Sequence, residues 1–169
     1  MPLENKKVRR VVHLVPSFGC GGLEKVIVNL VNHSDAYDVR HVLISLTTDF
    51  GLIKEFNVPV DVYCLGKKPG NDVVSHYKLY RLLKKIKPSA FHTYNFGAIE
   101  YHLVARLAGV KTRVHCDHGR GGDDPNGENH FNNKFRKFMS NFIDHYIVVS
   151  FDLYNWVTKD IGIRDDKVK

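Results

Sequence analysis

The segment VRRVVHLVPSFGCGGLEKVIVNLV, residues 8–31, decides the fold. Its first part, Val8 to Val15, is rich in β-branched residues and predicts a strand. Gly19, Gly21 and Gly22 then form a turn, and apolar side chains recur from there at positions 23, 26, 27, 30 and 31, which is one face of a helix. A strand that runs through a glycine-rich turn into a helix is typical of a Rossmann-like domain.

The rest of the chain alternates in the same way between β-branched runs and amphipathic helical runs. Further strands are expected at Val39 to Leu46, Val58 to Cys64, Ala90 to Tyr94, Thr112 to Cys116 and His145 to Val149, with the start of another at Val168. Helices are expected at Val73 to Lys87 behind the cap Asp72, at Ala98 to Ala108, at His130 to Phe142, and from the cap Ser150 to Asp160, with a short turn at Leu52 to Phe56. The alternation predicts one three-layer α/β/α domain over residues 1–169 with a mainly parallel sheet.

Composition excludes some classes of protein. The apolar fraction of 43% and charged fraction of 25% suit a globular domain, and no apolar run approaches the roughly 18 residues that span a bilayer. The first residues lack the apolar stretch of a signal peptide, so a cytoplasmic location is expected. Cys20, Cys64 and Cys116 are too widely spaced for a zinc site, which predicts buried or half-buried free thiols.

The net charge of +7 suits anionic partners but does not choose among them. The chain has no nucleic-acid-binding signature, so no nucleic-acid partner is expected. Two helices are basic: the first carries Lys78, Arg81, Lys84, Lys85 and Lys87, and the second carries Lys134, Arg136 and Lys137 opposite a stripe of Phe131, Phe135, Phe138, Met139 and Phe142. Such faces either contact an anionic membrane or are simply solvated.

The glycine turn is the first candidate site. Gly21 and Gly22 would let a ligand approach the backbone closely, and the following helix offers free N–H groups to an anion. The spacing is not G-x-G-x-x-G, because Glu24 stands where the third glycine would fall, and no Gly-Lys-Ser/Thr of a P-loop follows. The pattern favours phosphate or nucleotide contact, and the alternative is a tight turn without a ligand.

Two further segments follow expected strands and would reach the same crevice. His118, in the run from His115 to Gly122, could bind a sugar hydroxyl or act as a general acid or base, and Arg120 could hold a phosphate. The alternatives are a structural hydrogen bond for His118 and, less favoured, a metal site formed with His115 and Asp117. Asn95 either faces the crevice or caps the next helix.

Taken in order, several of these stretches resemble glycosyltransferase family 4, and most closely its bacterial members tied to exopolysaccharide-type sugar transfer. They are Val11-Val12-His13-Leu14-Val15, Gly21-Gly22-Leu23-Glu24, Asn29-Leu30-Val31-Asn32, Lys68-Pro69-Gly70-Asn71-Asp72, His92-Thr93-Tyr94-Asn95, Asp117-His118-Gly119-Arg120 and His145-Tyr146-Ile147-Val148-Val149-Ser150.

The resemblance implies the N-terminal, acceptor-side half of a GT-B fold in a retaining, metal-independent hexosyltransferase without a cofactor. It implies a nucleotide-sugar donor and a glycan or lipid-linked acceptor. If the basic helices contact a membrane, the expected place is the inner face of the plasma membrane. By position, His118 would lie beside the transferred sugar, Gly21 and Gly22 would approach the donor phosphates, and Asn95, Arg120 and Glu24 would contact ligands in the cleft.

The resemblance also implies a C-terminal donor domain that these 169 residues do not contain, so the chain is expected to be the front part of a longer protein and inactive alone. Two other functions stay open. One is a non-catalytic ligand-binding or scaffold module. The other, a dinucleotide oxidoreductase, is disfavoured by the broken glycine spacing and by the lack of a ribose-binding acid directly after Leu46.

Overall fold

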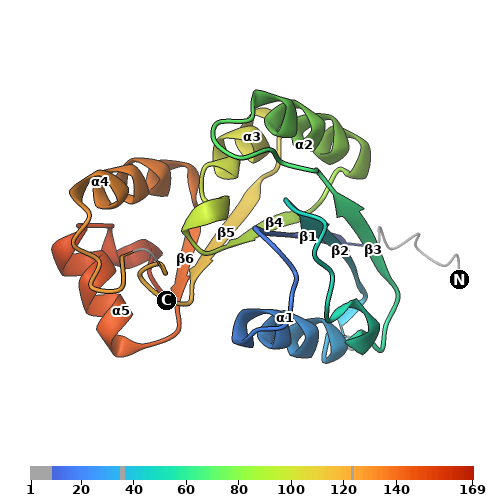
Figure 1. Cartoon of the computed structure of the whole chain (residues 1–169), viewed down its shortest axis with the longest axis horizontal. Coiled ribbons are helices and arrows are strands. Elements are labelled where there is room, and N and C mark those ends of the chain that lie inside the picture. Colours follow the sequence, from blue (N-terminus) through green and yellow to red (C-terminus); the bar gives the residue numbers. More distant parts are fainter. Residues whose placement is uncertain (1–8, 35–36, 123) are drawn as a thin grey trace, which may run out of the picture.

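A computed structural model describes residues 9–34, 37–122 and 124–169, so Val8, the expected first residue of the first strand, lies outside the described part. Six parallel strands form one sheet in the order β3-β2-β1-β4-β5-β6 (Figure 1). They are β1 (Arg9–Val15), β2 (Val39–Ser45), β3 (Val60–Cys64), β4 (Ala90–Tyr94), β5 (Thr112–Asp117) and β6 (His145–Val148). The predicted fold class, a Rossmann-like three-layer α/β domain, is confirmed.

The helices connect the strands in the order expected for parallel pairing. They are α1 (Gly22–Asn32), α2 (Val73–Ile86), α3 (Tyr101–Leu107), α4 (His130–Met139) and α5 (Phe151–Asn155). Short turns are Ile53–Glu55, Phe96–Ala98, Ser140–Phe142 and Asp165–Lys167, and α5 continues as a π-helical turn over Trp156–Asp160. None of the helices in the described residues combines the length and the apolarity needed to cross a bilayer.

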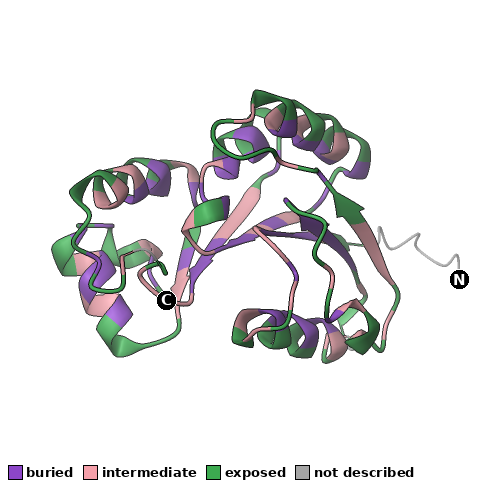
Figure 2. Cartoon of the chain, in the orientation of Figure 1, coloured by how far each residue is buried: buried purple, intermediate pink, exposed green. Residues whose placement is uncertain are grey.

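The sheet is buried on both faces because helices cover both. Val15 and Leu43 pack with the apolar face of α1, while the alternate residues Val12 and Leu14 pack with α2 and α3. A third apolar cluster, which contains Tyr146 and Trp156, joins α4, α5 and β6. Figure 2 shows the resulting pattern, with mostly buried inner strands and helices exposed on their outer sides.

The helix caps Asp72 and Ser150, which the sequence predicts, are both present. Asp72 Oδ1 accepts hydrogen bonds from the backbone N–H groups of Val74 and Ser75, and Ser150 Oγ accepts one from the N–H of Leu153. Val168 forms a single parallel bridge to Tyr146, at the position where a further strand was expected.

Two local predictions were wrong. The expected helix from Ala98 to Ala108 is instead a 3₁₀ turn over Phe96–Ala98 followed by the shorter α3, since Asn95 gives this segment no side-chain cap. Cys20 and Cys64 are exposed rather than buried, because the turn after β1 and the end of the edge strand β3 lie at the surface. Cys116, inside the sheet, is buried, and burial raises the pKa of its thiol to about 12.

Candidate functional site

The centre of the sheet has a topological switch point between β1 and β4. The chain leaves β1 toward β2, on one side, and later continues from β4 toward β5, on the other side. In sheets of this kind ligands bind beside the carboxyl ends of the strands at the switch point, where the two loops diverge. Here the loops touch, since a Cβ on Gly97 would lie 3.2 Å from Pro16.

A cavity of about 760 Å³ opens at this edge. It is lined by Asn95, His118 and Arg120, three of the predicted site residues, and Pro16 and Phe96 also contribute to it. Gly21, Gly22 and Glu24 do not line it. They lie instead where α1 begins, farther along the loop that contains Pro16, so the structure divides the predicted residues between the cavity and the adjacent glycine turn.

Asn95 connects two loops of the cavity wall. Its Oδ1 accepts a hydrogen bond of 2.9 Å from the backbone N–H of His118, and its own N–H donates to the Cys116 carbonyl. Its φ of 57° is positive, a conformation that side-chain-bearing residues rarely adopt and that is concentrated at functional sites. The alternative interpretation of Asn95 as a helix cap is therefore wrong, because its side chain holds the His118 loop.

His118 is half-buried, with its backbone fixed by Asn95. Its Nε2 atom is buried and has no hydrogen-bond partner among the described residues. Desolvation lowers the pKa of His118, and the nearby carboxylates Asp117 and Glu24 oppose that shift only in part. A neutral imidazole with an unpartnered nitrogen at a cavity wall can donate to, or accept from, a ligand hydroxyl.

Arg120 is already engaged. Its Nη2 lies 2.6 Å from Asp152 Oδ2, and its guanidinium lies 5.5 Å from the ring centroid of Trp156. A phosphate that used Arg120 would therefore have to compete with Asp152. The two carboxylates of the lining, Asp124 and Asp152, also make this wall less favourable for anions than the sequence suggested.

The glycine turn leaves room for a ligand at one position. Gly22 begins α1, and a Cβ built on it would meet nothing within 4 Å. At Gly21 a Cβ would lie 2.5 Å from Glu24 Oε2, so the mostly buried Glu24 packs against the turn instead of extending into open space. The free space at Gly22 is consistent with close approach of a ligand to the helix N-terminus.

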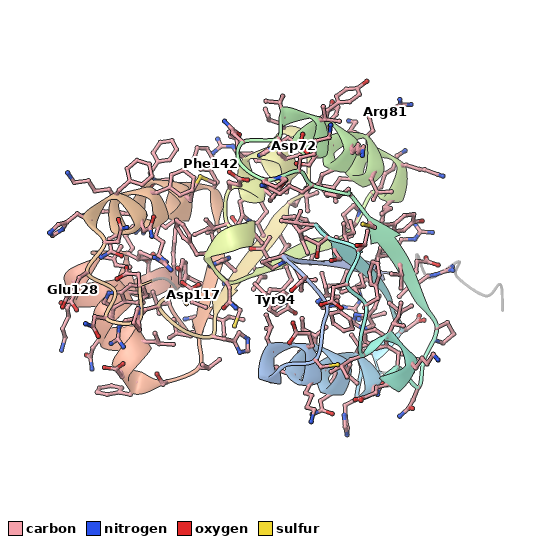
Figure 3. The ribbon with its side chains drawn as sticks, in the orientation of Figure 1. Asp72, Arg81, Tyr94, Asp117, Glu128 and Phe142 are labelled. Atoms are coloured by element: carbon pink, nitrogen blue, oxygen red, sulfur yellow. The ribbon has the colours of Figure 1, made fainter. Side chains whose placement is uncertain are left out.

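Sequence reasoning missed a buried polar cluster beneath the cavity. Asp117 is fully buried at the end of β5, where Tyr146 Oη donates a hydrogen bond to its Oδ2. His115 Nε2 lies 3.3 Å from Asp117 Oδ1, and Arg136 Nε lies 3.4 Å from Oδ2 (Asp117 is labelled in Figure 3). Burial acts to raise the pKa of Asp117, but His115, Arg136 and Tyr146 outweigh it, and the net shift is downward.

The less favoured metal site is not formed in the described residues, which contain no group of three ligands able to hold an ion. The reason is the alternation of a strand. His115 and Asp117 point to the same face of β5 and bond to each other, while His118 lies on the opposite side, near the ring of Tyr94.

The placement of Arg136 on an exposed basic face was wrong. Only 1% of Arg136 is exposed. Its guanidinium lies between the rings of Phe96 and Trp156, at 4.4 and 4.9 Å from their centroids, and Nη2 donates to the Arg120 carbonyl. The charge of Asp117 and these two aromatic faces draw the side chain inward, and the contact supports the loop that carries Arg120.

A second buried network runs on the other face of the sheet, through Tyr94, which is labelled in Figure 3. Ser34 Oγ donates to the Val31 carbonyl, so it must accept a hydrogen bond from His41 Nε2, 2.6 Å away. In a neutral His41, Nδ1 then accepts from His13 Nε2, 2.9 Å away. By the same reasoning Tyr94 donates to His13 Nδ1.

This series of hydrogen bonds ends at His92. Its Nδ1 lies 3.0 Å from the Tyr94 hydroxyl and must donate to it, because the Tyr94 proton is directed to His13. Neutral imidazoles satisfy this pattern, and the pKa values of His13, His41 and His92 are all lowered, with burial as the largest cause. Burial is the main cause that lowers the pKa of His13 well below 6.5 and that of His92 to about 3, and burial raises the pKa of Tyr94.

Comparison with known proteins identifies the family of the chain. Residues 20–169 match the family described as Glycosyltransferase Family 4, and the chain belongs to this family. No curated protein sequence matches the chain at a significant level.

Solved structures with the same fold are GT-B glycosyltransferases and related enzymes. HepE from Anabaena, crystallised in complex with UDP, matches with a TM-score of 0.72 at 16% identity, over 95% of this chain and 43% of its own. A glycosyltransferase from Rickettsia africae matches with 0.70 at 18% identity, over 95% and 42%. A UDP-N-acetylglucosamine 2-epimerase from Rickettsia bellii matches with 0.67 at 15% identity, over 96% and 44%.

These similarities show that the chain has the Rossmann-like α/β fold that occurs in GT-B glycosyltransferases. The chain spans less than half the length of each of these proteins.

Proposed function

We propose that this chain forms the acceptor-side half of a retaining, metal-independent glycosyltransferase. It would move a hexose from a nucleotide-sugar to a glycan or lipid-linked acceptor in polysaccharide biosynthesis. The observation that carries the proposal is the cavity at the switch point, which is lined by His118, a residue whose buried Nε2 has no partner among the described residues. The presence of UDP in the HepE structure supports a nucleotide-sugar as the donor.

In this proposal His118 forms a hydrogen bond to the transferred sugar. The bond is strongest in the transition state, so its loss slows the transfer step. Gly21 and Gly22 would let the donor phosphates approach the N-terminus of α1. Asn95 would position His118 through their hydrogen bond, and Arg120 would contact a ligand after exchange with Asp152. Glu24 would act through the turn and through the electrostatics of His118.

We propose that a donor domain completes the cleft and that the 169-residue chain alone does not transfer sugar. Half of a cleft cannot exclude water or stabilise a leaving diphosphate. The alternative is a non-catalytic ligand-binding or scaffold module of the same fold. Since an epimerase shares this fold, activity has to be measured rather than inferred from architecture.

The test uses the chain alone and the chain joined to a donor domain, with radiolabelled UDP-glucose as the probe. We expect label to enter a glycan or lipid fraction only with both halves present, and EDTA to leave the rate unchanged. His118→Ala should lower kcat/KM about 100-fold or more. The matched control is His145→Ala. His145 is the exposed first residue of β6, at the end of the strand away from the candidate site.

An unchanged rate in the His118→Ala protein would remove the proposed role of this residue. If neither the chain alone nor the chain joined to a donor domain transfers sugar or binds UDP-glucose, the scaffold alternative is favoured.

We also propose a cytoplasmic enzyme that binds the inner face of the plasma membrane peripherally. The exposed aromatic side chains and lysines of α4 support this part of the proposal, with Phe131 76% and Phe138 56% exposed.

A further inference from the structure

A second hollow lies at the amino-terminal ends of the strands, opposite the candidate site at their carboxyl ends. It forms where β1, β4 and β5 begin and where α2 and α3 end, and its volume is about 710 Å³. Leu83, Pro88 and Val110 form apolar parts of its wall. The volume falls in the range of small-molecule sites and exceeds what a single phosphate group fills.

The charge of this hollow is of one sign. Five of its lining residues are cations and none is a carboxylate: Arg9, Arg10, Lys84, Lys87 and Lys111. In the described residues none of the five forms an ion pair, whereas Arg40, Arg113, Arg120, Arg136 and Arg164 each pair with an aspartate.

Helix ends offset only part of this charge. The C-termini of α2 and α3 face the hollow, and each contributes roughly half a negative charge. Arg10 donates to the carbonyl of Ile86 at the end of α2, and Arg9 donates to the Tyr37 carbonyl. Five positive charges against about one negative charge leave an excess near +4, and since all five residues are exposed, this excess is available to attract an anion from solution.

Lys87 provides an independent indication. It is the C-cap of α2 and has a φ of 52°, in the left-handed region where glycine is the favoured residue. A lysine there strains the backbone and places a further cation at the hollow. Residues kept in strained conformations point to a function for the side chain.

We propose that this hollow binds a polyanion that carries two or more phosphate groups, at a site separate from the sugar-transfer cavity. Lysine and arginine side chains recognise phosphate by charge and by multiple N–H donors. The same chemistry is present in a soluble polyphosphate or nucleotide and in a lipid headgroup. The proposal does not depend on the function proposed above, because none of the lining residues is shared.

The test is isothermal titration of the full chain at low salt with two probes, sodium tripolyphosphate and soluble short-chain phosphatidic acid. Lys84→Gln/Lys111→Gln should weaken binding at least 10-fold. Lys87→Gly should weaken it several-fold and, because glycine suits the left-handed conformation, should not lower the melting temperature. The control Lys159→Gln removes an exposed charge beyond β6 and should change binding less than 2-fold.

Binding of tripolyphosphate that depends on Lys84, Lys87 and Lys111 supports a soluble ligand, and the same dependence for phosphatidic acid alone supports a headgroup. Binding of neither probe would overturn the proposal. Equal weakening by Lys159→Gln would also overturn it, since this would show general attraction to a basic protein instead of a site.

Discussion

Gly22 illustrates how one residue can serve a ligand instead of the fold. It is the first residue of α1, its φ is not positive, and a Cβ at this position would clash with nothing. Glycine has a conformational cost in a helix relative to alanine. The fold by itself therefore gives no reason for glycine at position 22. Close approach of a ligand to the open space above the helix N-terminus would give one.

Gly22→Ala should consequently separate stability from binding. We expect the free energy of unfolding to be unchanged or to rise by up to about 1 kcal/mol, because alanine restricts the unfolded chain. The KM for UDP-glucose should rise several-fold in the protein with both halves. Urea denaturation and steady-state kinetics measure the two effects. A higher stability with an unchanged KM would show that no ligand approaches this position.

Arg136 shows the opposite case. The sequence pattern predicts a surface charge at this position, but the fold buries it. The buried stripe of α4 and the turn after it consists of Arg136, Met139, Ser140 and Ile143, which recur at helical spacing. The helix is therefore rotated from the expected orientation, with Phe131 and Phe138 at the surface. The partner that decides this rotation, Asp117, belongs to a strand on the far side of a long loop.

The histidine chain connects elements in a similar way, since it joins β1, β2 and β4 to the end of α1. Each donor in it fixes the next acceptor, so a second proton on His13 or His41 breaks a hydrogen bond, whereas on His92 it places a charge on the buried, unpartnered Nε2. His102, on the other face, is also fully buried, and burial together with His115 lowers its pKa well below 6.5.

Stability should therefore fall in mild acid. The pKa values of His13, His92 and His102 are lower in the folded chain than the ordinary value of 6.5. As pH falls below 6.5 the unfolded chain binds protons that the folded chain does not, so each of these histidines removes up to about 1.4 kcal/mol per pH unit. For His92 this loss continues to its folded pKa of about 3.

Urea denaturation between pH 7.5 and 5 measures this loss, and the exposed-site variant His145→Gln should follow the same curve as the unaltered chain. A free energy of unfolding that stays constant over this range would contradict the neutral histidine network.

At the scale of the whole molecule, exposed apolar groups occur on α2, α3 and α4. These three helices lie along the upper side of the molecule in Figure 1, and Tyr77, Leu107 and Phe131, one on each helix, are each at least 60% exposed. Lys134 and Lys137 are also exposed on α4. Aromatic groups between basic side chains suit the interface of an anionic bilayer.

Membrane contact should thus depend on both the phenylalanines and salt. We expect the chain to co-sediment with phosphatidylglycerol vesicles at low salt, and Phe131→Ser/Phe138→Ser to reduce the bound fraction at least 3-fold. Phe151→Ser, which removes a phenylalanine that is 77% exposed on α5, is the matched control. Equal binding by all three proteins, or binding that salt does not weaken, would argue against this surface.

The sequence by itself determined the order and type of the elements, because local patterns encode them. The β-branched runs, the glycine turn before α1 and the caps Asp72 and Ser150 act over a few residues, and the structure has the corresponding elements within a few positions. The same patterns predicted that Asn95, His118 and Arg120 lie together, since residues that follow parallel strands meet at one end of the sheet, and all three line one cavity.

Only the tertiary structure decided how those side chains are used. The Asn95–His118 hydrogen bond, the Arg120–Asp152 pair and the burial of Arg136 each join residues 16 or more positions apart, and their energies depend on desolvation that no local pattern records. The basic hollow likewise collects cations from three separate segments. Sequence periodicity specifies which face of an element is apolar, whereas the partner of a buried charge follows from how the elements pack.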